Sequence, residues 1–283
     1  MSVNEAAHIA GMLGVSVREV NNVGSSHSWT LHRAVLADGR EVFVKASLDQ
    51  AAVFEAEAAG LRWLANGAPE LVPEVLAVDE RMLVLPWLPQ VAPTAAAAER
   101  FGRDLAALHV DSPGSFGAPW PGWIADLPLD NTPADGPWSR WYAERRLAPY
   151  LPRAAADLGR DGIRLLERVI ENIETLAGPP EPPSRIHGDL WSGNVLWTAD
   201  RAVLIDPAAH GGHRETDLAM LALFGTPHLD RIRAAYTETH PLADGWRTRI
   251  PLHQLHPLLV HIVLFGGGYR TQTLAAAAAA LGT

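Results

Sequence analysis

The chain has 283 residues, of which 48% are hydrophobic, a net charge of −9 and no cysteine. The length suits one large domain or two lobes, and the lack of cysteine excludes disulfides, thiolate metal sites and cysteine nucleophiles. No run reaches the roughly 18 apolar residues of a membrane helix, and the 23 lysines and arginines form no basic stripe typical of nucleic-acid binders. We expect a cytoplasmic protein with no membrane and no nucleic-acid partner.

The first part of the chain alternates strand and helix signals. A short helix is expected over Val3–Leu13, followed by a hairpin of Trp29–Ala37 and Glu41–Ala46 around the turn Asp38-Gly39. Asp-Gly between apolar runs favours a tight hairpin, because both turn positions take positive φ. The elements predicted after the hairpin are a helix over 51–65 and strands over 74–78 and 81–85.

Two ionisable residues in this part indicate a buried ion pair. Lys45 lies near the end of the second hairpin strand, and Glu57 lies at the edge of the apolar face that Phe54 and Leu61 define on the following helix. An unpaired buried charge is costly, so Glu57 needs a cation, and Lys45 is the natural candidate. Glu55 points to the flank of the helix and is expected to be solvated. A lysine in this position is typical of the kinase residue that holds the α- and β-phosphates.

A segment of small residues, 23–28, stands directly before the hairpin and reads Val-Gly-Ser-Ser-His-Ser. Its position suits a loop that covers phosphates, because small residues let backbone N–H groups approach phosphate oxygens. The plain alternative is a generic loop. The candidate phosphate contacts are Gly24, Ser25 and Ser26.

Prolines at 86 and 89 interrupt the strand pattern and mark a connecting segment. We expect Pro86, Trp87 and Leu88 to present backbone groups to an adenine ring; the plain alternative is a linker with a core tryptophan. From Thr94, which can cap a helix, the chain is mainly helical. The sequence therefore predicts an α+β fold, a small lobe with an antiparallel sheet and one main helix before a larger helical lobe. The predicted lobes are a nucleotide-binding lobe over 1–88 and a catalytic and substrate-binding lobe over 89–283.

The strongest chemical signal is the stretch His187–Asn194, which reads HGDLWSGN. An aspartate followed five positions later by an asparagine is the spacing of the kinase catalytic loop. The runs 195–197 and 203–205 predict a short hairpin that brings Asn194 and Asp206 to one metal site. Each motif alone could be a turn cap or a strand end, but both in this order favour phosphoryl transfer. The predicted roles are Asp189 as catalytic base and Asn194 and Asp206 as Mg²⁺ ligands, with ATP and Mg²⁺ as cofactors.

Further candidates lie around this stretch. Asp217 is expected to hydrogen-bond the backbone of the catalytic loop. His210 and His213 could suggest a metal, but no third ligand of suitable spacing stands near them in the sequence. Several tryptophans could stack on a sugar ring; most are expected to be core or loop anchors, and Trp191, inside the motif, is the favoured substrate contact. The other tryptophans considered are Trp120, Trp123, Trp138 and Trp141.

These motifs together resemble the fructosamine kinases, also called ketosamine-3-kinases. HGDLWSGN is more specific than the HGD-x4-N pattern shared with aminoglycoside and choline kinases, and the matches cover nearly the whole chain in the expected order. The matching stretches are HGDLWSGN at 187–194, IDPAAHGG at 205–212, HRETDLAMLALFG at 213–225, FVK at 43–45, FEAEA at 54–58, LAALH at 105–109 and the aromatic helix 138–147.

The resemblance implies a bilobal protein-kinase-like fold and ATP-dependent phosphorylation of a sugar hydroxyl (O3) on a fructosamine or ribulosamine, free or on lysine. The phosphorylated adduct is labile and releases the amine, which is deglycation. By the same resemblance Asp189 is the base, Asn194 and Asp206 hold Mg²⁺, and Lys45 with Glu57 positions phosphates. Trp191, His210 and His213 are assigned to the substrate side, and a monomer is favoured.

Two alternatives remain at this point. The first is a kinase of the same fold for another hydroxylated amine, such as an aminoglycoside. The second is a pseudokinase that binds nucleotide without turnover. The joint presence of Lys45, Asp189, Asn194 and Asp206 argues against the second, because decayed kinases usually lose one of these residues.

Overall fold

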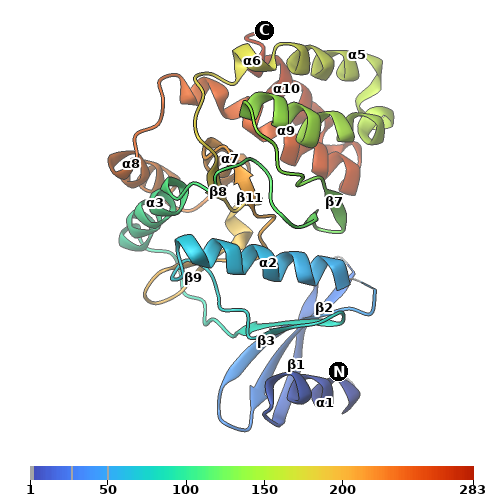
Figure 1. The fold of residues 1–283 in the computed structure, drawn as a ribbon, viewed down its shortest axis with the longest axis vertical. Coiled ribbons are helices and arrows are strands. Elements are labelled where there is room, and N and C mark those ends of the chain that lie inside the picture. The colour runs from blue at the N-terminus through green and yellow to red at the C-terminus, as the bar shows by residue number, and fades with distance from the viewer. Residues whose placement is uncertain (1–2, 27, 50) are drawn as a thin grey trace.

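The computed structural model describes residues 3–26, 28–49 and 51–283, in which a sheet-bearing part precedes a helical part (Figure 1). The elements of the first part are α1 (Val3–Leu13), β1 (Val17–Ser26), β2 (Trp29–Leu36), β3 (Glu41–Ala46), α2 (Ala51–Gly67), β4 (Ala77–Val78) and β5 (Met82–Pro86). The five strands form one antiparallel sheet in the order β1-β2-β3-β5-β4. Their side chains alternate between two faces, each covered by a different helix.

The alternation along β3 decides which residues face the rest of the molecule. Val42 and Val44 pack with Ile9 of α1 on one face. Phe43 packs on the opposite face, in the cluster that contains Phe54 of α2. Lys45 shares this second face, so its side chain reaches α2 and the helical part.

The predicted hairpin is confirmed, with Gly39 at φ +89° in the turn between β2 and β3. The expected loop at 23–28 is wrong for its first four residues. β1 continues through Ser26 and pairs with β2, with Gly24 opposite Leu31 and Ser26 opposite Trp29. Pairing with β2 satisfies the backbone N–H and C=O groups of this segment by hydrogen bonds. His27 lies outside the described residues. Of the strand expected over 74–78, only the last two residues belong to β4.

The helical part begins with α3 (Ala95–Val110), whose N-cap Thr94 accepts a hydrogen bond from Ala97 N as predicted. Short strands and helical turns then alternate with longer helices. The long helix α5 is kinked at Gly159, where φ is +71°. The remaining elements are β6 (Gly122–Ile124), β7 (Leu127–Leu129), α4 (Trp138–Tyr142), a π-helix (Ala143–Leu147), 3₁₀ turns at 148–150, 192–194 and 267–269, α5 (Leu151–Glu171), α6 (Ile173–Leu176), β8 (Ser184–Ile186), β9 (Val195–Trp197), β10 (Ala202–Leu204), β11 (His210–Gly212), α7 (Glu215–Leu223), α8 (Leu229–Thr239), α9 (Trp246–Phe265) and α10 (Arg270–Ala280).

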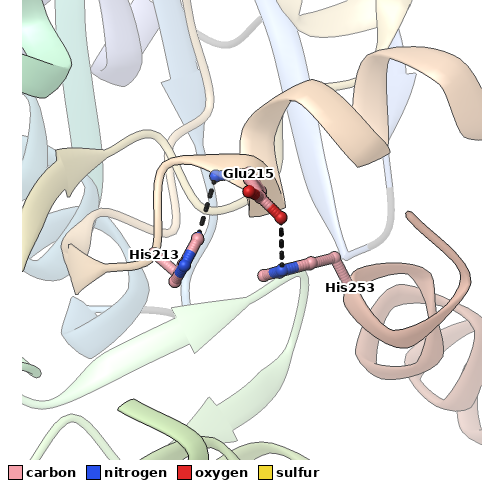
Figure 2. Close-up of side chains that lie close together, drawn as sticks. All are labelled: His213, Glu215 and His253. Carbon is pink, nitrogen blue, oxygen red and sulfur yellow. Dashed lines mark hydrogen bonds and ion pairs between the residues drawn. The ribbon is translucent and has the colours of Figure 1, made fainter. Parts of the chain in front are cut away.

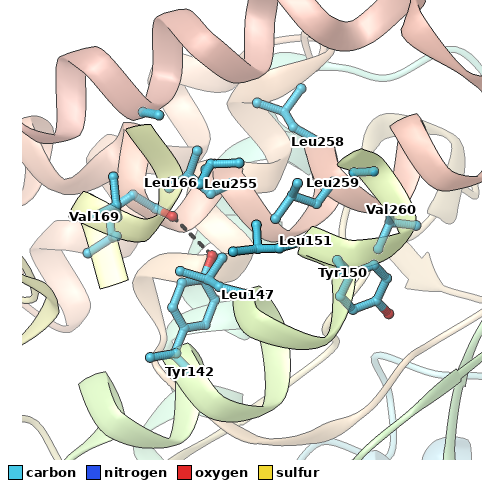
Figure 3. Packing of buried hydrophobic residues seen from close by; sticks show 14 of the residues in the cluster. Tyr142, Leu147, Tyr150, Leu151, Leu166, Val169, Leu255, Leu258, Leu259 and Val260 are labelled. Carbon is cyan, nitrogen blue, oxygen red and sulfur yellow. Dashed lines mark hydrogen bonds between the residues drawn. The ribbon is translucent and has the colours of Figure 1, made fainter. Parts of the chain in front are cut away.

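Two large apolar clusters hold the helical part together. One lies around α5 and α9, where leucines of both helices pack on Tyr142, and the Tyr142 hydroxyl donates a hydrogen bond to the Leu252 carbonyl at 2.9 Å (Figure 3). The other joins the two parts of the molecule, because Phe54 and Leu85 belong to it together with Phe101 of α3. The sheet therefore shares a core with α3 and with Leu190 of the loop His187–Asn194, which lies between β8 and β9.

The architecture agrees with the predicted α+β fold class, an antiparallel sheet with one main helix followed by a mainly helical part. Within the described ranges, no helix is both long and apolar enough to cross a membrane.

Candidate active site

The loop His187–Asn194 and the hairpin of β9 and β10 form the centre of the site. β9 starts directly after Asn194, and β10 returns antiparallel to it. Ile205 N donates a hydrogen bond to the Asn194 carbonyl at 3.1 Å, which holds the end of β10 beside the loop. The next residue is Asp206. The hairpin predicted to bring Asn194 and Asp206 together is therefore confirmed.

Asn194 ties the loop together through its amide nitrogen. Its Nδ2 donates to the Asp189 carbonyl at 2.8 Å and to Asp189 Oδ2 at 3.1 Å. These bonds leave the Oδ1 atom of Asn194 as an acceptor. Asp206 has φ +52°, a left-handed conformation that aspartate tolerates better than most residues, and its side chain is 42% exposed.

Lys45 joins the sheet to this centre. Its ammonium lies 2.7 Å from Glu57 Oε2 and 2.9 Å from Asp206 Oδ1, so the predicted Lys45–Glu57 ion pair is confirmed. Glu55 is exposed, also as expected. Trp29 covers the cation, with the Lys45 ammonium 4.6 Å from its ring centre.

Burial and neighbouring charges act in opposite directions on this group. Burial alone would lower the pKa of Lys45, but the Asp206 and Glu57 carboxylates raise it above the usual value, so the ammonium stays charged. Burial would raise the pKa of Asp206, yet the Lys45 charge and hydrogen bonds from its neighbours lower it. Asp206 is therefore an ionised carboxylate.

Asp189 behaves differently although it lies nearby. Burial, reinforced by the negative charge of Asp206, raises the pKa of Asp189 to about 7. A carboxylate with a pKa near neutrality can accept a proton and release it again at physiological pH. This is the property that a general base requires.

Asp217 of α7 holds the backbone of the loop His187–Asn194 in place. Its carboxylate accepts hydrogen bonds from His187 N at 2.7 Å and Gly188 N at 3.0 Å, as predicted. The same carboxylate lies 3.2 Å from His109 Nε2, and His109 Nδ1 lies 2.9 Å from the Tyr236 hydroxyl. His187, Asp217, His109 and Tyr236 are buried, and Gly188 is half-buried, so most of this network is shielded from water.

Two adjoining cavities open beside these residues and share Ser26, Trp29 and Asp206. We call the first the inner cavity; it is lined by the catalytic-loop residues and by α9. We call the second the linker cavity; it is lined by the sheet, β9 and the segment after β5. The inner cavity is lined by Ser26, Trp29, Lys45, Val53, Glu57, Trp123, Ile124, Ala125, Asp189, Trp191, Asn194, Asp206, Pro207, Pro257, Val260, His261, Leu264 and Phe265.

The linker cavity contains the three residues expected at the adenine ring, Pro86, Trp87 and Leu88. Its other walls are mainly apolar and include Leu31, Phe43, Leu85, Leu196 and Ile205. Of the three small residues expected at phosphates, Ser26 lines both cavities. Gly24 and Ser25 are not among the described lining residues of either.

Trp191 and Gly193 show why the loop has its particular sequence. The Trp191 side chain is 40% exposed and lines the inner cavity. Its ring lies directly over Gly193, where an added Cβ would meet the ring at 2.2 Å. Only glycine at 193 leaves room for this ring. Trp123 also lines the cavity, whereas Trp138 and Trp141 are buried in the core and Trp120 packs on Trp63.

The substrate role expected for His210 and His213 is corrected by their positions. Both side chains are buried, and neither belongs to the described lining of the inner cavity. His210 Nδ1 lies 2.8 Å from the Ala208 carbonyl, and its ring packs on Trp141. Burial lowers the pKa of His210 to about 3, which keeps it neutral. β11 is a short internal strand, and this location could not be deduced from its sequence.

His213 does have ligand-type neighbours that the sequence did not reveal. Glu215 and His253 lie close to it, so that one potential ligand atom of each falls within 4.8 Å of the others (Figure 2). Arg249, however, binds both oxygens of Glu215 at 2.6 and 2.9 Å. A metal would place further positive charge beside that guanidinium. The group is therefore a buried ion-pair clamp between α7 and α9.

Several residues that line the inner cavity were not predicted from the sequence. Trp29 stood in an ordinary strand pattern, and its contact with Lys45 depends on how β2 pairs with β3. His261 and Phe265 lie on α9, far along the chain from the catalytic loop. Their spacing of four residues on an apolar helix was the available signal, but the same spacing is typical of core residues.

Known proteins of similar sequence and structure place this site among the kinases. A family model described as fructosamine kinase matches residues 5–281. A probable ketoamine kinase of Thermus thermophilus is 35% identical over 232 residues, 82% of this chain and 84% of that protein. The crystal structure of a protein assigned as a fructosamine-3-kinase from Thermobifida fusca covers 100% of both chains with 55% identity and a TM-score of 0.96. An ADP-bound aminoglycoside phosphotransferase, 14% identical over 99% of both chains with a TM-score of 0.66, shares the fold.

Proposed function

The chain belongs to the fructosamine kinase family, and on this premise we propose that it phosphorylates the O3 hydroxyl of a fructosamine or ribulosamine. Kinases of this family are phosphotransferases that take ATP as donor. In the proposed reaction the hydroxyl oxygen bonds to the γ-phosphorus, the bond from that phosphorus to the β–γ bridging oxygen breaks, and ADP leaves. The hydroxyl proton passes to Asp189. The labile 3-phosphate adduct then loses inorganic phosphate by β-elimination, and water hydrolyses the resulting imine to a carbonyl and the free amine.

The residues near Asp189 have the chemistry of a Mg²⁺ site. Asn194 makes the hydrogen bonds described above through Nδ2 only, which leaves its Oδ1 available as a ligand atom. Asp206 is an ionised carboxylate that lines the inner cavity. Amide and carboxylate oxygens are the donors that Mg²⁺ prefers. When bound, Mg²⁺ would supply positive charge to the phosphate oxygens. We assign Asn194 Oδ1 and the Asp206 carboxylate as its protein ligands.

The two cavities suggest where the nucleotide lies. We propose that the adenine ring enters the linker cavity against Pro86, Trp87 and Leu88, since that cavity is mainly apolar and ends at Asp206. Lys45, held by Glu57, then faces the phosphates at the boundary of the two cavities. We further propose a division of labour in which residues 1–88 bind nucleotide and residues 89–283 bind the acceptor.

The observation that carries this proposal is a convergence of charges on one cavity. Three residues from separate segments meet there: the buried lysine Lys45, the ionised aspartate Asp206, and Asp189, whose pKa is about 7. Phosphoryl transfer needs these three functions, a phosphate-binding cation, a metal ligand and a base.

The test is a coupled assay of ADP release with ATP, Mg²⁺ and three acceptors: fructosyl-lysine, ribulosyl-lysine and kanamycin. We expect release with at least one ketosamine and a product heavier by one phosphate in mass spectrometry. Asp189→Asn serves as the matched control for contaminating ATPase. Release with kanamycin alone, or no release with any acceptor above that of Asp189→Asn, would refute the proposal.

A further inference from the structure

Five aromatic side chains form a continuous strip at the edge of the inner cavity. We call it the aromatic rim: Trp191, Phe224, His261, Phe265 and Tyr269. Neighbouring ring centres lie 6.5 Å apart for Trp191 and Phe224, 4.9 Å for Phe224 and His261, 5.5 Å for His261 and Phe265, and 4.7 Å for His261 and Tyr269. These separations are those of edge-to-face and tilted aromatic contacts.

The rim is open to solvent at the point where a substrate would enter. Trp191 is 40%, Phe224 37% and Phe265 59% exposed, and these are three of the seven exposed large apolar side chains in the described part of the chain. Trp191, His261 and Phe265 line the same cavity as Asp189. Contiguous exposed apolar surface is uncommon on a protein and usually marks a binding site.

None of the five rim residues carries a carboxylate, and the Asp157 carboxylate, which lies close to Gly267 between Phe265 and Tyr269, is outside the described lining of the inner cavity. The described residues lining the inner cavity include three carboxylates, Glu57, Asp189 and Asp206, and all of them belong to the phosphate end. His261 Nδ1 donates a hydrogen bond to the Pro257 carbonyl at 2.7 Å, and burial lowers the pKa of His261. The α9 wall therefore offers aromatic faces and one neutral nitrogen acceptor.

We infer that the aromatic rim binds the amine substituent of the ketosamine and favours substrates whose amine carries an aromatic group. The inference rests on the proposed function, because it places the sugar hydroxyl at Asp189 and the rest of the molecule outward along α9. An aromatic substituent can stack on Trp191 or Phe265 and remove apolar surface of both partners from water. A polycationic amine finds no carboxylate on this wall within the described lining.

Two adducts of the same sugar test this inference: 1-deoxy-1-benzylamino-ribulose and 1-deoxy-1-methylamino-ribulose, or the fructose pair if ribulose is not accepted. The measurement is kcat/KM from ADP release for each. We expect the wild type to prefer the benzyl adduct about tenfold, the effect of a good aromatic contact. In Phe265→Ala and Phe224→Ala the ratio of the two kcat/KM values should fall towards one.

The matched control is Val110→Ala, because Val110 is also 59% exposed but lies at the end of α3 outside the lining of both cavities. This variant should keep the wild-type ratio. Phe265 is exposed, so its replacement should not unfold the protein, and the thermal midpoint of each variant verifies this.

Three outcomes would overturn the inference. Equal kcat/KM values for both adducts in the wild type, or an unchanged ratio in both phenylalanine variants, would remove the rim from specificity while the kinase assignment stands. A dimer in sedimentation that dissociates in Phe265→Ala would show that a second copy covers the rim instead. No turnover with any ketosamine would overturn the inference together with the proposed function.

Discussion

Lys45 shows at a single residue how burial and pairing decide chemistry. It is 3% exposed, and it remains charged because two carboxylates and the face of Trp29 replace its water. Asp189 and Asp206 lie in the same cavity, yet their pKa values move in opposite directions. Asp206 contacts Lys45 and Asp189 does not, which contributes to the difference. Glu57 also contacts Lys45, but burial and the negative charge of Asp206 raise the pKa of Glu57 to about 8. The cavity thus contains one ionised carboxylate, Asp206, and two acids whose pKa lies near neutrality, Asp189 and Glu57.

Replacing Asp189 by asparagine should abolish most catalysis. The amide keeps the size of the side chain but cannot accept the hydroxyl proton, so kcat should fall about 100-fold or more. The affinity for ADP, measured by calorimetry, should change little. The wild-type kcat/KM should also rise with pH through about 7 as the carboxyl ionises. A variant with the wild-type rate would exclude Asp189 as the base.

The same residue predicts a pH dependence of stability in the nucleotide-free protein. The folded pKa of Asp189, about 7, lies above its ordinary value of 3.8. The folded state therefore favours the protonated acid, and this contribution to stability is lost as pH rises through 7. Asparagine resembles the protonated form at every pH. Asp189→Asn should gain more thermal midpoint over the wild type at pH 8 than at pH 5; an equal difference at both would contradict the raised pKa.

Gly193 gives a third prediction at this scale. A Cβ there would meet the Trp191 ring at 2.2 Å, so Gly193→Ala must displace the ring from its place at the cavity. If Trp191 contacts the acceptor, kcat/KM for the ketosamine should fall about tenfold or more, since small misplacements are costly in catalysis. Ser192→Ala is the neighbouring control and should retain activity. Wild-type kinetics in Gly193→Ala would show that the position of Trp191 is unimportant.

At the scale of elements, helix contacts rather than helix propensities position the site. α7 carries Asp217 beneath the catalytic loop, and the clamp of Glu215 and Arg249 fixes α7 to α9. α9 in turn supplies the wall of the inner cavity with His261 and Phe265. Breaking the pair of Glu215 and Arg249 would leave an uncompensated buried charge and weaken the contact between α7 and α9. The position of the cavity wall on α9 therefore depends on the same contact as the position of Asp217 on α7.

The contact between α3 and α8 is a close helix approach that allows a direct test. A Cβ on Gly102 would lie 2.3 Å from the Ile232 carbonyl oxygen, a backbone atom that cannot move aside. Gly102→Ala should lower the free energy of unfolding by about 2 kcal/mol. Gly11 in α1 has nothing within 4 Å of its added Cβ, so Gly11→Ala should be neutral or stabilise by up to about 1 kcal/mol. Urea titrations of the two variants decide; similar values for both would contradict the packing.

At the scale of the whole molecule, one apolar cluster joins the sheet-bearing part to the helical part. Phe54 and Leu85 of the sheet-bearing part share a cluster with Phe101, Leu190 and Leu204 of the helical part. Since this cluster is common to the two proposed lobes, we expect them to unfold together. The nucleotide, bound at their junction, should stabilise both.

ADP with Mg²⁺ at 100 times its dissociation constant should add about 2.7 kcal/mol of stability. For a chain of this size the thermal midpoint should rise by about 5 °C or more, in a single transition. Lys45→Ala should largely remove the shift, because it deletes the proposed phosphate contact. Two separate transitions, of which only one moves, would show that the lobes are independent.

The sequence by itself determined much of the fold and the centre of the site. The hairpin of β2 and β3, the Thr94 cap, the pair of Lys45 with Glu57 and the loop anchor Asp217 all followed from local rules of turn chemistry, capping and the cost of buried charge. The two strand runs after HGDLWSGN, 195–197 and 203–205, placed Asn194 and Asp206 together, because a short hairpin is a local structure.

The tertiary structure alone decided what depends on distant segments. It continued β1 through Ser26, buried His210 and His213 in the core, and brought His253 and Arg249 of α9 to Glu215. It also placed α9 opposite the catalytic loop, which formed the aromatic rim. The physical reason is that burial and contact between remote helices depend on how all the elements pack at once. Capping, turns and the charge pair between β3 and the helix that follows it are fixed by a few neighbouring residues.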